Sequence, residues 1–597
     1  MSNIKTTSSR RAGSAKLLFG YVIAEKTKFI KTLMMVFLAV GFDVLGPMLS
    51  KIFIDDFIMP GHYPTWPIVG VISLFILSIV MATYLKYQQT LRFLDIALNA
   101  VLDIRKRVFK HVLKLPVSYF DYARTGNLVS RITNDTESIK DIYVQFLSNI
   151  LANIIMLLGI LTAMAILDFQ LMLVALLLIP AVMGLIFLYQ KFSVKAVTQS
   201  RQYRSEINSS VSESISGMAV IQSTNQQQAK SDQFDDVNHH YYSTRLKSVV
   251  VGSLLLRPAI NLLSILVLGA VVWFFGLKVI QGVTEVGVLY AYLNYLGRFT
   301  EPLVEITQRF GLYQQAIVAG NRVYELLQEP LEQHDKASIE TIEHGNLVID
   351  DVSFSYEKDK PVLRSVSIQA NRGKFYAIVG HTGSGKSTLL NLLLNFYQPD
   401  SGEITIDGSS LNQYTTAALR NGIGFIPQEP FVLASTVFDN IDMGRKLSQS
   451  EVENAARKAH LHDIIEQMEQ GYQTELGEGG LRLSKGQRQQ LIIARALAGK
   501  PKILLLDEAT ANIDSETEQI VQRALNELRG SVTLIVVAHR LSTIHHADNI
   551  FVLDKGALLE QGTHSELMAK ESGRYRAMYQ LQQQQRRVTQ AEEVTEK

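Results

Sequence analysis

Six long apolar runs occupy the first half of this 597-residue sequence and limit what it can fold into. They lie near residues 29–53, 66–88, 146–167, 169–190, 252–277 and 284–307. A helix needs about 20 apolar residues to cross the hydrocarbon core of a bilayer, and each run reaches that length. Each run is also apolar around most of its circumference, whereas a surface helix of a globular protein is apolar on one side only. The pattern therefore predicts six membrane-spanning helices rather than a large soluble core.

Lysine and arginine are concentrated before the first run, between the second and third, and between the fourth and fifth. The remaining links are short and poor in positive charge, and positively charged links stay on the cytoplasmic side. We therefore expect a multi-pass protein of a bacterial cytoplasmic membrane, surrounded by the lipid bilayer, with both termini in the cytoplasm.

The two basic links are longer than a simple turn requires, and parts of them have helical patterns. Leu98–Leu115 and Ser205–Gln228 are expected to be helical extensions of the spans into the cytoplasm. The chain would reverse direction near residues 119–136 and 212–225, which would present short elements below the membrane.

The overall composition excludes several functions. The sequence contains 58 basic and 56 acidic residues, so no strong positive field suggests a nucleic-acid partner. It contains no cysteine, which excludes disulfides, thiolate metal sites and cysteine nucleophiles.

After residue 330 the sequence becomes polar and then alternates short apolar runs with helical patterns. The runs at residues 347–350, 375–379, 503–506 and 533–537 read as strands. Continuous apolar strands of this kind predict a parallel sheet that is buried on both faces.

A glycine-rich loop follows the run at 375–379 directly and precedes an apolar helical run. Its residues are Gly380, His381, Thr382, Gly383, Ser384, Gly385, Lys386, Ser387 and Thr388. The order of strand, loop and helix is the context that a phosphate-binding P-loop requires. We expect Lys386 to reach the β- and γ-phosphates of a nucleotide and the Ser387 hydroxyl to bind Mg²⁺.

An acidic pair follows the strand at 503–506. Asp507 is the expected second Mg²⁺ residue, and Glu508 is placed to polarise an attacking water. His539, which follows the strand at 533–537, is a candidate for contact with the γ-phosphate, although a histidine at a strand end is more often structural.

The order of these motifs resembles the ATP-binding cassette (ABC) transporters. Residues that look like further motifs of that family are Tyr356 in VSFSY, Gln428 in FIPQEP, Ser484, Lys485, Gly486 and Gln487 in LSKGQ, and Asp514 in ANID. The resemblance implies a half-transporter: a polytopic α-helical membrane domain of exporter type at 1–330, a linker at 331–344, an α/β nucleotide-binding domain at 345–580, and a polar tail at 581–597.

The resemblance also implies roles for these residues. Tyr356 would stack on adenine, and Gln428 would contact Mg²⁺ or the attacking water. Two nucleotide-binding domains would dimerise head to tail, so that Ser484 and Gly486 of one chain face the ATP held by the other. ATP and Mg²⁺ are the implied cofactors, and a second half-transporter is the implied partner.

Three positions depart from the family pattern: Lys485 replaces a glycine of the signature, the D-loop reads Ala511–Asp514, and Gly479 stands where exporters often have arginine. This combination resembles one subunit of the heterodimeric exporters, which have one competent and one degenerate ATP site. A lysine that points into solvent in a homodimer is the alternative.

The transported substrate is the part that the sequence defines least. Asp43 lies inside the first apolar run, where an ionisable residue is a candidate for function. It could attract a cationic amphiphile or bond to a neighbouring helix, while Arg298, Glu301 and Glu305 could form a cytoplasmic end or gate. Apolar spans favour export of hydrophobic small molecules or lipid-like compounds. A peptide exporter and an ATP-gated channel or regulator are the alternatives.

Overall fold

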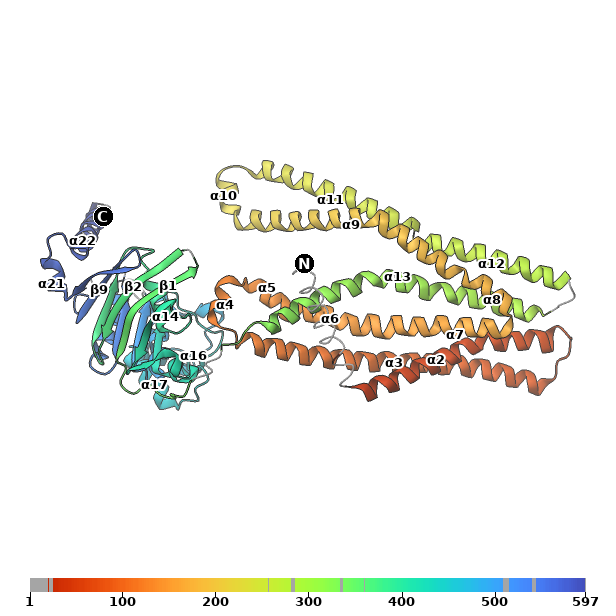
Figure 1. Cartoon of the computed structure of the whole chain (residues 1–597), viewed down its shortest axis with the longest axis horizontal. Coiled ribbons are helices and arrows are strands. Elements are labelled where there is room, and N and C mark those ends of the chain that lie inside the picture. Colours follow the sequence, from red (N-terminus) through yellow and green to blue (C-terminus); the bar gives the residue numbers. More distant parts are fainter. Residues whose placement is uncertain are drawn as a thin grey trace. The chain divides into compact units, whose positions relative to one another are not determined.

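The structure, a computed structural model, describes residues 20, 25–255, 257–280, 285–332, 337–358, 360–507, 515–538 and 544–595. It consists of two compact units (Figure 1). The first contains Met1–Leu115 and Ala123–Pro330, and the second contains Pro116–Tyr122 and Leu331–Lys597. The short segment Pro116–Tyr122 therefore packs with residues that follow much later in the sequence.

Where it is described, the first unit contains helices joined by turns and no strand. Its elements are α2 (Lys26–Phe53), η1 (Ile54–Ile58), α3 (Thr65–Val112), α5 (Thr125–Ser130), η2 (Arg131–Asp135), α6 (Thr136–Asp141), η3 (Ile142–Ile150), α7 (Leu151–Leu167), α8 (Phe169–Leu176), α9 (Leu178–Ser216), α10 (Met218–Ser223), α11 (Gln227–Leu255), α12 (Arg257–Ile280) and α13 (Val286–Gln328).

Among the described residues, five helical stretches are long and apolar enough to cross a membrane: Lys26–Ile58, Thr65–Val112, Thr125–Leu167, Phe169–Ser216 and Gln227–Lys278. They contain the first five predicted spans. The sixth predicted span lies in α13, which is not among these five stretches, so the count of six stays a prediction.

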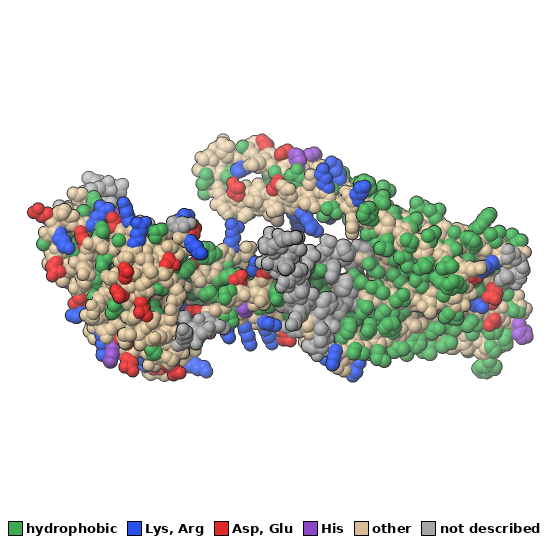
Figure 2. Space-filling view, viewed as in Figure 1, with side chains coloured by type: hydrophobic (Ala, Val, Ile, Leu, Met, Phe, Trp, Pro, Cys, Tyr) green, Lys and Arg blue, Asp and Glu red, His purple; other side chains and the backbone are tan. Residues whose placement is uncertain are grey.

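Apolar side chains both fill and cover this unit. Tyr292, Tyr295 and Phe299 recur at helical spacing on α13 and are fully buried against α7, α8 and α12. Other large apolar side chains, such as Phe187 and Trp273, are exposed. Figure 2 shows hydrophobic side chains covering the part of the unit that holds α7, α8 and α12, as expected of a surface in contact with lipid.

The helical extensions are partly as predicted. Helix α3 continues without a break from Thr65 to Val112, which confirms the first extension. The second extension, predicted over Ser205–Gln228, is a continuous helix only to Ser216, where α9 ends, and the chain reverses within the predicted range 212–225. Gly217 caps α9 and Asn225 adopts a positive φ of 54°, so the chain turns around the short helix α10.

The second unit contains two sheets. The larger has the strand order β10-β9-β3-β8-β7-β6, in which all neighbouring pairs are parallel except β10 with β9. Its strands are β3 (Phe375–Val379), β6 (Ile423–Ile426), β7 (Ile503–Asp507), β8 (Thr533–Val537), β9 (Asn549–Asp554) and β10 (Ala557–Gly562). Apolar cores cover both faces, as predicted for strands that are apolar throughout.

The smaller sheet is antiparallel and has the order β2-β1-β4-β5. Its strands are β1 (Leu347–Glu357), β2 (Lys360–Ala370), β4 (Ser401–Ile406) and β5 (Ser409–Ser410). The assignment of residues 347–350 to the parallel sheet is therefore wrong. Burial alternates along β1, which is typical of a strand that packs one face only.

Helices surround these sheets. They are α4 (Val117–Tyr122), α14 (Lys386–Leu393), η4 (Leu411–Gln413), α15 (Thr416–Gly422), α16 (Val437–Asp442), α17 (Gln449–Lys458), α18 (His462–Glu466), η5 (Gly471–Gln473), η6 (Glu478–Gly480), α19 (Lys485–Ala498), α20 (Ser515–Glu527), α21 (His564–Ala569) and α22 (Arg574–Thr595). The C-terminal tail continues as helix to Thr595.

Candidate nucleotide site

The loop between β3 and α14 has the backbone of an anion site. Gly383 and Gly385 have φ angles of 81° and 99°, which residues with a Cβ rarely adopt. Gly380 has no space for a side chain, because a Cβ there would lie 2.2 Å from the carbonyl oxygen of Leu553. The loop ends at the N-terminus of α14, where backbone N–H groups and the helix dipole favour negative charge.

Lys386 is held inside this loop. Its side chain is only 6% exposed, and its Nζ donates hydrogen bonds to the carbonyl oxygens of Gly380 (2.9 Å) and His381 (3.1 Å). The Ser384 hydroxyl is also buried, while Ser387, the expected Mg²⁺ residue, is exposed. The loop therefore combines a fixed ammonium group with glycine backbone and an open hydroxyl, a set of groups that suits a phosphate and its metal ion.

Tyr356, at the end of β1, lies beside this loop. Its hydroxyl donates to the Thr388 hydroxyl at 3.3 Å and accepts a hydrogen bond from the Asn391 amide at 3.4 Å. The ring stands edge-to-face against Phe354 and Tyr397. The aromatic residue predicted to stack on adenine is thus partly exposed next to the helix that follows the P-loop.

The carboxyl ends of the parallel strands bring further predicted residues to the same edge of the sheet. Asp507 ends β7, and β8 separates that strand from β3. Gln428 follows β6, whose last residue, Ile426, pairs with Leu506. Ligands of open α/β sheets bind at this edge. Glu508, Asp514 and His539 lie outside the described residues.

The predicted signature forms the start of α19. Ser484 is the N-cap: its hydroxyl accepts from the Gln487 N–H at 3.2 Å, and the Gln487 side chain accepts from the Ser484 N–H at 2.9 Å. Lys485, the first residue of the helix, is exposed, and Gly486 is buried. The first turn has no acidic residue, so Lys485 adds positive charge to the positive end of the helix dipole.

Comparison with known proteins identifies the family to which this chain belongs. The ABC transporter transmembrane region matches residues 29–303, and the ABC transporter domain matches residues 363–511. The chain is 39% identical over 568 residues to the "Multidrug resistance-like ATP-binding protein MdlB" of Buchnera aphidicola subsp. Acyrthosiphon pisum (strain APS). The alignment covers 95% of this chain and 97% of that protein. The chain belongs to the ABC transporter family.

Two further relatives place it among the ABC exporters. It superimposes on a bacterial Atm1-family ABC exporter with ATP bound, with a TM-score of 0.78 and 27% identity over 93% of this chain and 98% of that one. It is also 34% identical to the ATP-dependent lipid A-core flippase of Aliivibrio fischeri (strain ATCC 700601 / ES114), over 82% of this chain and 84% of that protein. The chain is an exporter-type half-transporter and an ATPase whose hydrolysis is coupled to transport.

The nucleotide-binding unit of this ABC exporter contains one contact that sequence reasoning missed. Tyr397 donates its hydroxyl to the Asp121 carboxylate on α4, and burial together with that carboxylate raises the pKa of Tyr397. Its ring also packs against Tyr356 at 5.0 Å between centroids. A tyrosine in the segment NFYQPD gave no signal, because its partner lies far away in the sequence.

Arg495 is a second residue that the sequence did not single out. It donates to the carbonyl oxygens of Asn440 (2.7 Å) and Phe431 (2.8 Å), and so ties α19 to the segment that follows Gln428. Burial, together with the nearby Arg445, lowers the pKa of Arg495 to about 10. The signature helix and the glutamine loop are therefore mechanically connected.

In the transmembrane domain, Asp43 is bonded to two neighbouring helices. Its carboxylate accepts from Lys86 Nζ on α3 at 2.6 Å and from Arg298 Nη1 on α13 at 2.7 Å. Two cations thus pair with it, and this is the helix-bonding role that the sequence left open. Arg298, for which a gate or cytoplasmic end was considered, is one of these partners. Contact of Asp43 with a substrate stays a prediction.

Proposed function

We propose that this chain is one half of a dimeric exporter that moves hydrophobic or amphipathic compounds, of multidrug or lipid-like type, out across a bacterial cytoplasmic membrane. Both termini lie in the cytoplasm in this proposal. The observation that carries it is a P-loop geometry suited to phosphate, fused in one chain to long apolar helices. The printed names of the relatives, which include multidrug resistance-like proteins and a lipid A-core flippase, support the substrate class.

Each part of the nucleotide site has a proposed role. Tyr356 stacks on adenine, Lys386 and the P-loop amides bind the phosphates, and Ser387 with Asp507 and Gln428 holds Mg²⁺. Glu508 polarises the attacking water, and His539 contacts the γ-phosphate. Asp514 and the signature residues Ser484, Lys485, Gly486 and Gln487 act at the ATP of the other subunit.

The other subunit is a different chain in this proposal. Glycine at position 485 would let the helix backbone approach a γ-phosphate closely, whereas Lys485 places a Cβ and a long side chain there. The site that Lys485 faces is then the degenerate one. The site formed by Lys386, Asp507 and Glu508 is competent and uses the normal signature of the partner.

Exposure of Lys485 is also compatible with a homodimer, because the side chain can point into solvent. Co-expression of this chain, tagged, with a candidate second half-transporter separates the two arrangements. The heterodimer predicts that the two chains co-purify in equal amounts and that ATPase activity requires both. An active, transporting homodimer of this chain alone would contradict it.

A further inference from the structure

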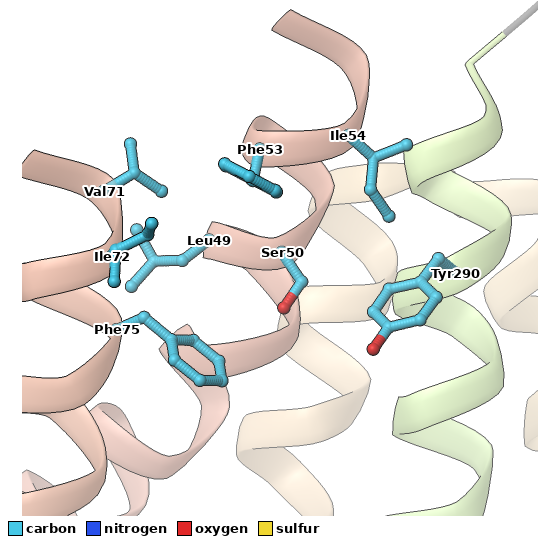
Figure 3. Close-up of a pocket in the computed structure, with 8 residues that line it drawn as sticks. All are labelled: Leu49, Ser50, Phe53, Ile54, Val71, Ile72, Phe75 and Tyr290. Carbon is cyan, nitrogen blue, oxygen red and sulfur yellow. The ribbon is translucent and has the colours of Figure 1, made fainter. Parts of the chain in front are cut away.

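Two pockets lie along the same helices of the transmembrane domain. The first has a volume of about 340 Å³ and is mainly apolar. Figure 3 shows Leu49 of α2 pointing toward Ile72 and Phe75 of α3, with Tyr290 of α13 on the other side of Ser50. A pocket of this size and lining suits a hydrocarbon chain.

The second pocket, of about 280 Å³, is the more polar of the two: its lining contains five ionisable side chains among apolar ones. It is lined by Asp43, Lys86 and Arg298, and further along by Gln89, Glu301 and Glu305. At Asp43 two cations share one carboxylate, which gives a local excess of positive charge, whereas Glu301 and Glu305 add two negative charges to the pocket as a whole. Ionisable groups at membrane depth are costly and mark functional positions.

Gly46 lies between residues that line the two pockets. A Cβ on Gly46 would lie 3.6 Å from Phe75, which lines the apolar pocket, and 4.0 Å from Arg298 Nη2, which lines the polar one. Pro47 has no N–H to donate to the Asp43 carbonyl, and Arg298 Nη1 supplies that hydrogen bond at 2.8 Å. The guanidinium is therefore fixed at the junction by the backbone of α2.

Apolar, cationic and hydrogen-bond-accepting side chains follow one another in the same order along α13 and α3. On α13, Tyr290 of the apolar pocket comes first, then Arg298, and then Glu301 and Glu305 one and two turns later. On α3, Phe75 comes first, then Lys86, and then Gln89. The pockets thus run from apolar through cationic to hydrogen-bond acceptors.

Glu301 pairs with Arg257 Nη2 at 3.6 Å, and Glu305 accepts from the Asn153 amide at 3.0 Å. The cations and Gln89 nevertheless have further capacity to bind a ligand. Within the described part of the chain, Arg298 Nη2 donates to no acceptor, and Lys86 Nζ donates only to Asp43. Gln89 is 8% exposed, and its side-chain oxygen has no donor among the described residues. A buried acceptor without a donor is costly, so a ligand that supplies one is favoured.

We propose that the two pockets together bind a zwitterionic amphiphile of the phospholipid type. Its hydrocarbon chain occupies the apolar pocket, its phosphate binds Lys86 and Arg298, and its ammonium group donates to Gln89 and Glu301. This assignment rests on the proposed export function and narrows its substrate class. The order of tail, anion and cation in such a lipid matches the order along the helices.

Photo-labelling of the purified full transporter without ATP tests this assignment. The probe is phosphatidylethanolamine with a diazirine in its acyl chain, and labelled peptides are mapped by mass spectrometry. We expect labels within residues 49–54 and 71–75. We also expect unlabelled phosphatidylethanolamine to compete about tenfold better than phosphatidic acid, diacylglycerol or an alkyltrimethylammonium of equal chain length, the difference expected for one charged hydrogen bond.

Paired glycine variants provide the control. Gly46→Leu fills the junction and should reduce labelling about tenfold, whereas Gly41→Leu, on the same helix with no atom within 4 Å of its Cβ position, should leave labelling unchanged. Lys86→Gln should weaken competition by phosphatidylethanolamine but not by diacylglycerol, and it leaves the Arg298 bond to the Asp43 carbonyl intact.

Three outcomes would overturn the assignment. They are labels outside residues 49–54 and 71–75, competition by diacylglycerol or the alkyltrimethylammonium that equals competition by phosphatidylethanolamine, and equal labelling of Gly46→Leu and wild type. Equal competition by phosphatidic acid would overturn the ammonium contact. Labelling needs no ATP, so these failures are distinct from failure of the export proposal, which is tested by ATP-driven transport in vesicles.

Discussion

At the scale of single residues, the nucleotide site depends on residues whose surroundings leave little space for another side chain or another conformation. Gly380 lies against the Leu553 carbonyl, and Lys386 is held by two carbonyl oxygens of its own loop. Lys485 is different: it is exposed at the start of α19, and its side chain forms no hydrogen bond or ion pair among the described residues. Its charge is therefore available to another molecule.

Lys485→Gly tests that role. Removal of the side chain would let a γ-phosphate approach the helix backbone, so we expect several-fold faster hydrolysis or faster nucleotide release at the proposed degenerate site. Lys446→Gly is the control, because it removes one exposed positive charge elsewhere at a residue whose φ of 61° suits glycine. Trapped nucleotide per dimer and ATPase rate are the measurements, and no change in either would make Lys485 a neutral substitution.

Tyr397 gives a second prediction at this scale. Tyr397→Phe removes the hydrogen bond to Asp121 but keeps the ring against Tyr356, so ATP binding should be nearly unchanged. We expect faster amide hydrogen exchange in segment 116–122 and weaker stimulation of ATPase by transported compounds. Tyr414→Phe is a control, since Tyr414 is bonded within the same unit to the Ile406 carbonyl. Unchanged exchange in segment 116–122 would contradict the role given to Tyr397.

At the scale of elements, the start of α13 is fixed against the end of α2. The Asp55 carboxylate of η1 accepts the Gly287 N–H at 2.7 Å, which satisfies one of the free donors at this helix terminus. A Cβ on Gly287 would lie 2.6 Å from the Lys51 carbonyl oxygen. These two helices also line both pockets, so their packing determines the shape of the proposed lipid site.

Gly287→Ala should therefore destabilise the transmembrane domain. Overpacking typically costs about 1–3 kcal/mol, while alanine in an open helical position gains about 0.5–1 kcal/mol. Gly297→Ala is the matched control, because it lies on the same helix with no atom within 4 Å of its Cβ position. Thermal unfolding of the purified transporter should show a lower midpoint for Gly287→Ala only. Equal midpoints for the two variants would refute the close contact.

At the scale of the whole molecule, local patterns predicted much of the fold. Strand, P-loop and helix at 375–393 follow from contiguous residues, as do the strand ends that place Asp507 and Gln428 at one edge. Contacts between distant segments were not predictable. The partners of Asp43, the Tyr397–Asp121 bond and the antiparallel placement of β1 all depend on which segments meet in three dimensions.

ATP-driven uptake into inside-out vesicles tests the central claim most directly. Vesicles that contain the wild-type chain and its partner should accumulate a fluorescent amphiphile against its gradient when ATP and Mg²⁺ are added. Glu508→Gln should bind ATP but abolish accumulation, because the proposed water-polarising carboxylate is lost. Accumulation that persists in Glu508→Gln, or wild-type vesicles that only equilibrate the compound, would contradict ATP-driven export by this chain.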